Sequence, residues 1–267
     1  MPTNGQFSVG ELVTASDANS LFVRGYGNRI INGNFEINQR GYTSGTNLAS
    51  GAYGFDRWKS GFTNTALTFT DGVQNTTVTI SSSGVLNQVI ERENMPAGTY
   101  ILSWFGTATG RIYNAGSTPP GYTAGPITVT LDGSANVVVE FTASGGTRTL
   151  GLVQVEAGTV FSPFQYRHRG EELLLCYRYF YTEIYGSVGT MWSGFGNSYA
   201  SAFAPPLRMR ISPTATVIGT TTVYTTAGVA SVVTPILSVT FFRSLRASVV
   251  GTFAYMEGLE YSLSAEL

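Results

Sequence analysis

Short runs of alternating apolar and polar residues, rich in valine and threonine, recur along most of this chain. Alternation with a period of two predicts half-buried β-strands, because successive side chains of a strand point to opposite faces. In the first part of the chain, such runs cover residues 67–69, 77–80, 100–104, 127–131, 137–141 and 152–155. Many short strands separated by turns predict an antiparallel sandwich or jelly roll rather than a parallel α/β sheet.

A turn signal and a second group of runs extend this prediction. Asp132-Gly133 lies between two of the runs and predicts a β-hairpin, because glycine tolerates the positive φ of a tight turn. β character returns after residue 184, in residues 215–218, 221–225, 237–241 and 247–250. We therefore expect a second, smaller β region in the last part of the chain.

Two segments show helical spacing. The first, residues 14–25, opens with the capping-box spacing of Thr14 and Asp17, and a helix this short needs to dock on other protein surface. The second runs from Gly170 to about Tyr181, with two glutamates in its first turn and an apolar face formed by Leu173, Cys176, Tyr177 and Phe180. We therefore divide the chain into an N-terminal segment, residues 1–27, a first β domain, residues 28–167, and a helix with a smaller β domain, residues 168–267.

Charged residues make up only 12% of the chain, the formal net charge is -1, and glycine supplies 32 residues. This composition favours an all-β protein over a helical bundle. The basic residues are scattered singly, so we expect no binding to nucleic acid. No apolar run approaches the roughly 18 residues that cross a bilayer, so we expect no membrane insertion. The first residues lack the pattern of a signal peptide, and we expect synthesis in the cytoplasm of a host cell.

Residues suited to catalysis are scarce. Cys176 and His168 are the only residues of their type, which excludes an intramolecular disulfide and a zinc site made of cysteine and histidine. Cys176 lies on the apolar face of the predicted helix, and His168 lies between two arginines without a Gly-x-Ser-x-Gly motif to accompany it. We therefore expect that the protein is not an enzyme. A glycan depolymerase is the enzymatic alternative, and it would need a cleft with two carboxylates.

Aromatic residues in glycine-rich segments are the candidates for ligand binding. Tyr113 and Tyr122 flank a loop that is rich in turn-forming residues, and each offers a ring and a hydroxyl for a glycan contact. The alternative is that this loop packs on a neighbouring chain. Trp192 and Tyr199 lie in a second glycine-interrupted aromatic stretch, which could line a receptor groove or a subunit interface.

Several segments resemble the small tail-fibre and receptor-binding proteins of tailed bacteriophages. Residues 10–19 (GELVTASDAN) are similar to the virion-proximal start of many phage fibres. Residues 28–41 (NRIINGNFEINQRG) and 53–58 (YGFDRW) look like the opening of a jelly roll of the carbohydrate-binding-module type. The most specific resemblance is in residues 154–158 (QVEAG), 162–164 (SPF) and 171–180 (EELLLCYRYF), and it continues in 205–214 (PPLRMRISPT) and 265–267 (AEL).

The resemblance implies a structural protein of the virion tail that attaches the phage to its host. It implies a homotrimer, with residues 1–27 bound to other tail or virion proteins and the jelly roll forming the body. The last β domain would then be the host-facing tip, which binds a glycan or a protein of the host surface without catalysis. A different class of function stays open, namely a purely structural capsid fibre, head-decoration fibre or tail adaptor.

The resemblance also implies a structural calcium ion. In related jelly rolls, an acidic or amide residue near the first strand and a carboxylate near the last strand hold Ca²⁺ with backbone carbonyls. The corresponding residues here are Asn34, Glu36 and Glu156, although Asn34 stands where aspartate is frequent, which removes one negative charge. The alternative is that Asn34 and Glu36 bond local backbone and Arg40 or Arg57. We expect no other cofactor.

Overall fold

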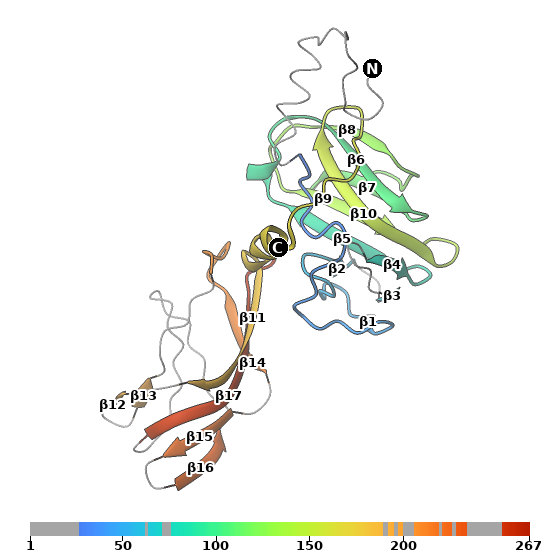
Figure 1. The fold of residues 1–267 in the computed structure, drawn as a ribbon. Helices are drawn as coiled ribbons and strands as arrows, with labels where there is room; N and C mark the ends of the chain where they lie inside the picture. Colours follow the sequence, from blue (N-terminus) through green and yellow to red (C-terminus); the bar gives the residue numbers. More distant parts are fainter. Residues whose placement is uncertain are drawn as a thin grey trace, which may run out of the picture.

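The computed structural model describes residues 27–61, 64–70, 76–188, 192–194, 197–199, 206–218, 221–225, 228–233 and 253–267. These residues form a two-sheet sandwich before residue 158 and another sheet after residue 179, with one helix between them (Figure 1). The prediction of an all-β fold is confirmed. The division at residues 27 and 167 remains a prediction.

The sandwich consists of a six-stranded and a four-stranded antiparallel sheet. The six-stranded sheet has the order β1 (Asn47–Leu48), β3 (Thr65–Thr70), β4 (Thr77–Ile80), β10 (Arg148–Ala157), β6 (Gly98–Gly106) and β8 (Ile127–Leu131). The four-stranded sheet has the order β2 (Lys59–Ser60), β5 (Val85–Ile90), β9 (Val137–Thr142) and β7 (Thr109–Asn114), and a 3₁₀ turn, η1 (Arg92–Asn94), follows β5. Every strand predicted in this part of the chain is present, whereas β1, β2, β5 and β7 were not predicted.

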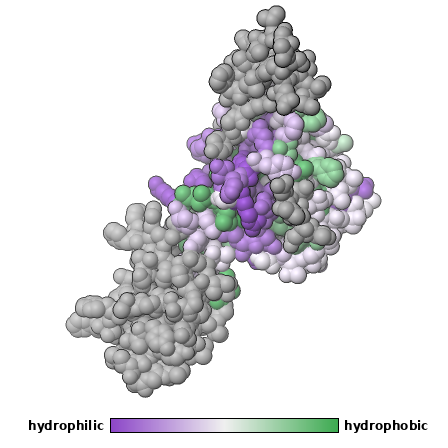
Figure 2. Space-filling model, in the orientation of Figure 1, coloured by the Kyte–Doolittle hydropathy of each residue, from purple (hydrophilic) through white to green (hydrophobic). Residues whose placement is uncertain are grey.

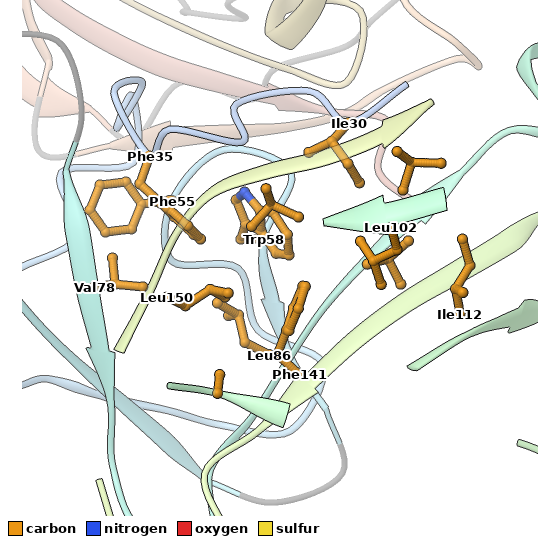
Figure 3. Close-up of a cluster of buried hydrophobic side chains, with 14 of the residues drawn as sticks. Ile30, Phe35, Phe55, Trp58, Val78, Leu86, Leu102, Ile112, Phe141 and Leu150 are labelled. Carbon is orange, nitrogen blue, oxygen red and sulfur yellow. The ribbon is translucent and has the colours of Figure 1, made fainter. Parts of the chain in front are cut away.

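The hydrophobic core lies between these two sheets. Val78 and Leu150 come from the six-stranded sheet, and Leu86 and Phe141 come from the four-stranded sheet (Figure 3). Loop residues before β2 complete the core: the ring of Phe35 stacks on Trp58 with 4.9 Å between centroids, and Phe35 also meets the edge of Phe55. Trp58 is fully buried, and its indole N–H donates to the Asn32 carbonyl at 2.8 Å.

The turn at Asp132-Gly133 does not close a hairpin, which corrects our prediction. Gly133 has the expected positive φ of 71°. The strand before it, β8, pairs with β6, whereas the strand after it, β9, pairs with β5 and β7. Because β8 and β9 belong to different sheets, the turn connects one sheet of the sandwich to the other.

The helix α2 (Arg169–Tyr177) follows the sandwich and ends earlier than predicted. His168 caps its first turn, with Nδ1 accepting the Gly170 N–H at 3.2 Å. Phe180 already belongs to the next strand, β11 (Phe180–Val188), where it pairs with Ser264. The last residues of the predicted helix, from Phe180 on, therefore form a strand instead of a helix.

The sheet after α2 is antiparallel. Its strands are β11, β14 (Thr214–Ile218), β15 (Thr221–Thr225), β16 (Gly228–Val233) and the long central β17 (Phe253–Ser264), and β12 (Trp192–Gly194) pairs with β13 (Asn197–Tyr199) beside it. We refer to β11 and β14–β17 as the β11–β17 sheet. The predicted strands at 237–241 and 247–250 and the predicted helix at 14–25 lie outside the described residues.

Figure 2 shows a hydrophilic band through the middle of the described face, with small, separate hydrophobic spots beside it. Within the described part of the chain, no helix is long and apolar enough to cross a membrane.

Candidate functional site

The outer face of the four-stranded sheet carries a row of polar side chains. Leu86, Ile112 and Phe141 point into the core, so the residues that alternate with them point away from it. Arg111, Glu140, Asn87 and Lys59 are Cα partners across β7, β9, β5 and β2, and they form one row on this outer face.

Glu140 is the centre of this row and receives three hydrogen bonds on one oxygen. Arg111 donates to Glu140 Oε1 from Nε at 2.8 Å and from Nη2, and the Tyr122 hydroxyl donates to the same oxygen. The side chain of Glu140 is only 3% exposed. A buried carboxylate with charge-assisted donors holds its partners in a defined geometry.

Tyr113 and Tyr122 come together around the Arg111 guanidinium. The guanidinium carbon lies 4.1 Å from the centroid of the Tyr122 ring and 5.4 Å from that of Tyr113. Tyr113 is on β7, two residues after Arg111, whereas Tyr122 comes from the loop that follows the strand. Both rings are partly exposed. The two residues that the sequence singled out on either side of the loop therefore belong to one surface, which we call the Tyr113–Tyr122 site.

The loop between β7 and β8 folds back onto β7. Gly110 and Thr123 form a β-bridge through two backbone hydrogen bonds of 2.9 Å, and Arg111 Nη1 donates to the Pro120 carbonyl at 3.1 Å. These contacts place Tyr122 above the sheet and restrict its motion. The site is therefore preorganised, although one ring comes from a loop.

Both tyrosines are held in the neutral form. Burial raises the pKa of Tyr122 well above its usual value, and the hydrogen bond to Glu140 raises it further. Burial and the charge of Glu140 also raise the pKa of Tyr113. At neutral pH, each therefore keeps its hydroxyl proton.

The row continues toward β2 with Asn87 and Lys59. Asn87 is 8% exposed, and its Oδ1 has no hydrogen-bond partner among the described residues. Lys59 Nζ donates to the main-chain oxygen of Leu267 at 2.6 Å, and burial and the nearby Arg57 lower its pKa. A buried amide oxygen beside Glu140 thus lacks a donor among the described residues.

The other predicted aromatic pair is placed by its backbone. Trp192 and Tyr199 are opposite each other as Cα partners of β12 and β13. Their side chains lie outside the described part of the structure. Their role in binding remains a prediction.

The three predicted calcium ligands take part in two sets of hydrogen bonds. Glu36 accepts from Asn34 Nδ2 at 3.1 Å and pairs with Arg169 at 3.0 Å. Glu156 accepts from Ser162 through the backbone N–H at 2.7 Å and through the hydroxyl at 2.8 Å. Among the described residues, no group of three or more His, Cys, Asp and Glu side chains is placed to hold a metal ion. Calcium binding at Asn34, Glu36 and Glu156 stays a prediction.

Arg111 and Glu140 were missed by the sequence analysis. Glu140 lies in the predicted run 137–141, where its polar side chain indicated only the solvent side of a strand, and Arg111 lies in β7, which was not predicted. Glu140 is 29 residues from Arg111 and 18 from Tyr122, and the pairing of β7 with β9 together with the Gly110–Thr123 bridge brings the three together.

Comparisons with known proteins found a distant structural similarity. No protein-family model matches the chain, and no curated protein matches it. Among solved structures, the chain is similar to the enzymatically active domain of tailspike protein 4 from bacteriophage CBA120, with a TM-score of 0.34 and 14% identity. The match covers 50% of this chain and 22% of that chain, so this protein spans less than a quarter of that structure.

This finding corrects one of our predictions. We expected that the protein is not an enzyme, whereas the similar solved chain bears the name of an enzymatically active domain. The similar solved chain is also a phage tail protein, which is the class that the sequence resembles. A likeness this distant assigns neither a reaction nor a catalytic residue to this chain.

Proposed function

We propose that this protein is a component of a phage tail that binds glycans of the host surface through the Tyr113–Tyr122 site. The observation that carries the proposal is the convergence of two partly exposed tyrosines on Arg111 and the buried Glu140. The resemblance of residues 154–180 to phage tail proteins supports the tail assignment.

The chemistry of the site suits a polyhydroxylated ligand. Tyrosine rings offer apolar area to the faces of sugar rings at a low entropy cost, because only two torsions are ordered. Arg111 is neutralised by Glu140, so the site does not depend on a negatively charged ligand.

The proposed homotrimer would make weak sites sufficient. Three copies on one fibre, and several fibres on one virion, act together, and linked weak contacts can raise the overall affinity about 100-fold or more. The homotrimer and the attachment of residues 1–27 to other tail proteins are parts of the same proposal, as is the placement of the last β domain toward the host.

Binding to an array of immobilised bacterial lipopolysaccharides and capsular polysaccharides tests the proposal. We expect Tyr113→Ala to weaken binding about 2- to 10-fold, because it removes a ring from the site. Tyr122→Phe keeps the ring and removes the hydroxyl that donates to Glu140, so it is expected to weaken binding less. Tyr166→Ala is the control, since Tyr166 is 55% exposed and is not part of the site.

Each alternative has its own outcome. Unchanged binding by both site variants would remove the Tyr113–Tyr122 site from the proposal. Failure of the unmodified protein to bind any polysaccharide of the array would favour the purely structural role in the virion. Loss of polysaccharide mass during incubation would identify a depolymerase.

A further inference from the structure

The first and the last residue of the β11–β17 sheet lie side by side, next to the sandwich. Phe180 begins β11, Ser264 ends β17, and the two are Cα partners. Just beyond this pair, the Ala265 N–H donates to the Tyr179 carbonyl at 2.7 Å. The chain therefore enters and leaves this sheet at one place, and Figure 1 marks the last residue beside α2.

Residues 265–267 bind directly to the sandwich. The Glu266 carboxylate pairs with Arg40 at 2.8 Å and with Arg57. The side chains of Arg57 and Glu266 are 2% and 7% exposed. The Tyr53 hydroxyl donates to the Leu267 main-chain oxygen at 2.7 Å, and Lys59 donates to the same oxygen.

The same arginines also contact the start of the sheet. The guanidinium carbon of Arg57 lies 3.5 Å from the centroid of the Tyr179 ring, and that of Arg40 lies 3.6 Å from the centroid of Phe180. Two side chains of the sandwich thus bind both ends of the sheet. The contact is electrostatic and aromatic, which gives it a fixed geometry.

This junction combines polar side chains with the rings of Tyr179 and Phe180, and these residues are not part of the core of the sandwich. Gln39 Oε1, Arg40 Nε and Arg57 Nε are buried there, and none has a hydrogen-bond partner among the described residues. Polar contacts of this kind are typical of interfaces between parts that keep their own cores. The surfaces at the junction can therefore tolerate water if the contact opens.

We propose that Ala265, Glu266 and Leu267 form an anchor that sets the orientation of the β11–β17 sheet relative to the sandwich. Without it, the sheet keeps its covalent link to α2 through Arg178 and Tyr179 and the contacts of Gln39 and Arg40 with Phe180 at the start of β11. The anchor adds the end of β17 as a second attached strand end, which restricts rotation of the sheet. The anchor transmits force and orientation between the two parts, whichever of them binds the host.

Hydrogen–deuterium exchange of the full chain with Glu266→Gln tests this anchor. The substitution keeps the size of the side chain and removes the charge that pairs with Arg40 and Arg57. We expect the amides of Ala265 and of the first residues of β11 to exchange at least about tenfold faster, because the local opening becomes easier. Amides of β9, in the centre of the sandwich, are expected to exchange as before.

Two further variants complete the test. Glu93→Gln is the matched control, because it breaks the Arg92–Glu93 pair, in which both side chains are more than 60% exposed. Tyr53→Phe removes one hydrogen bond to Leu267 and gives a milder version of the same effect if Glu266→Gln does not fold. Unchanged exchange at Ala265 and β11, or faster exchange that extends to β9, would overturn the anchor.

Discussion

Asp56, Arg57 and Trp58 show how three successive residues take three different environments. Trp58 is in the core, and the carboxylate of Asp56 accepts the backbone N–H and the side-chain amide of Gln39, each at 2.7 Å. Arg57 adopts a positive φ of 70°, and its guanidinium pairs with Glu266. The partner of Arg57, 209 residues away, was not predictable from the sequence.

Asp56 makes the stability of the protein depend on pH. Burial raises its pKa to about 6 from 3.8, although the Gln39 bonds and the nearby Arg40 oppose the shift. Between these two values, the unfolded chain releases the proton of Asp56 and the folded protein keeps it. The contribution of Asp56 to the free energy of unfolding therefore falls by roughly 3 kcal/mol as the pH rises through this window. Above the window, this contribution stays level.

Urea unfolding of Asp56→Asn at pH 4 to 7 measures this contribution. We expect the variant to lack the part of the pH dependence that Asp56 causes, so the stability of the variant relative to the unmodified protein rises by roughly 3 kcal/mol as the pH rises through this window. A constant difference across this range would show that Asp56 titrates normally in the folded protein.

At the scale of elements, strands with regular alternation were predictable and irregular ones were not. β5 (VLNQVI) breaks the alternation, because the polar Gln88 points inward and is 1% exposed. Its amide accepts the Ile31 N–H at 2.9 Å and donates to the Ile31 carbonyl at 2.8 Å. A buried glutamine that bonds a distant backbone cannot be distinguished from a surface residue by sequence pattern alone.

Helix α2 depends on Glu172 to dock on the sandwich. Glu172 is 6% exposed, accepts the Asn32 N–H at 2.5 Å and pairs with Arg167 at 3.0 Å. The sequence indicated only a glutamate in the first turn of a helix. Its neighbour Glu171 fulfils that role at the exposed surface.

These two glutamates form a matched pair of variants. Glu172→Gln is expected to lower the free energy of unfolding by about 3 kcal/mol, because it leaves Arg167 buried without its counter-charge. Glu171→Gln is expected to cost less than about 1 kcal/mol through the helix dipole. Chemical denaturation of both proteins gives the comparison, and equal effects would show that Glu172 does not dock the helix.

At the scale of the whole molecule, the all-β class and the helix between two β regions were predictable, but the binding surface was only partly so. Tyr113 and Tyr122 followed from turn residues and aromatic content. Arg111 and Glu140 depend on which strands become neighbours, and pairing over long sequence separation is not encoded in local pattern. The Asp132-Gly133 turn shows the same limit, since its conformation was predictable and its partners were not.

The proposed homotrimer has a direct measurement. Three chains of 28.5 kDa give about 85 kDa, and we expect this native mass from light scattering during gel filtration. A native mass of about 85 kDa would show that three chains associate in solution. A single species of 28.5 kDa would contradict the trimer for the isolated protein.

The loop between β7 and β8 separates what must stay constant from what can vary. Its fixed points are the Gly110–Thr123 bridge, the Arg111–Pro120 contact and Tyr122 on Glu140. Residues 115–119 lie outside these points and are all exposed. Under the proposed function, substitutions at positions 115 and 117–119 alter ligand preference while the folding core is untouched, whereas the positive φ of 87° at Gly116 disfavours any other residue there. Host range can then diversify at this loop with little loss of stability.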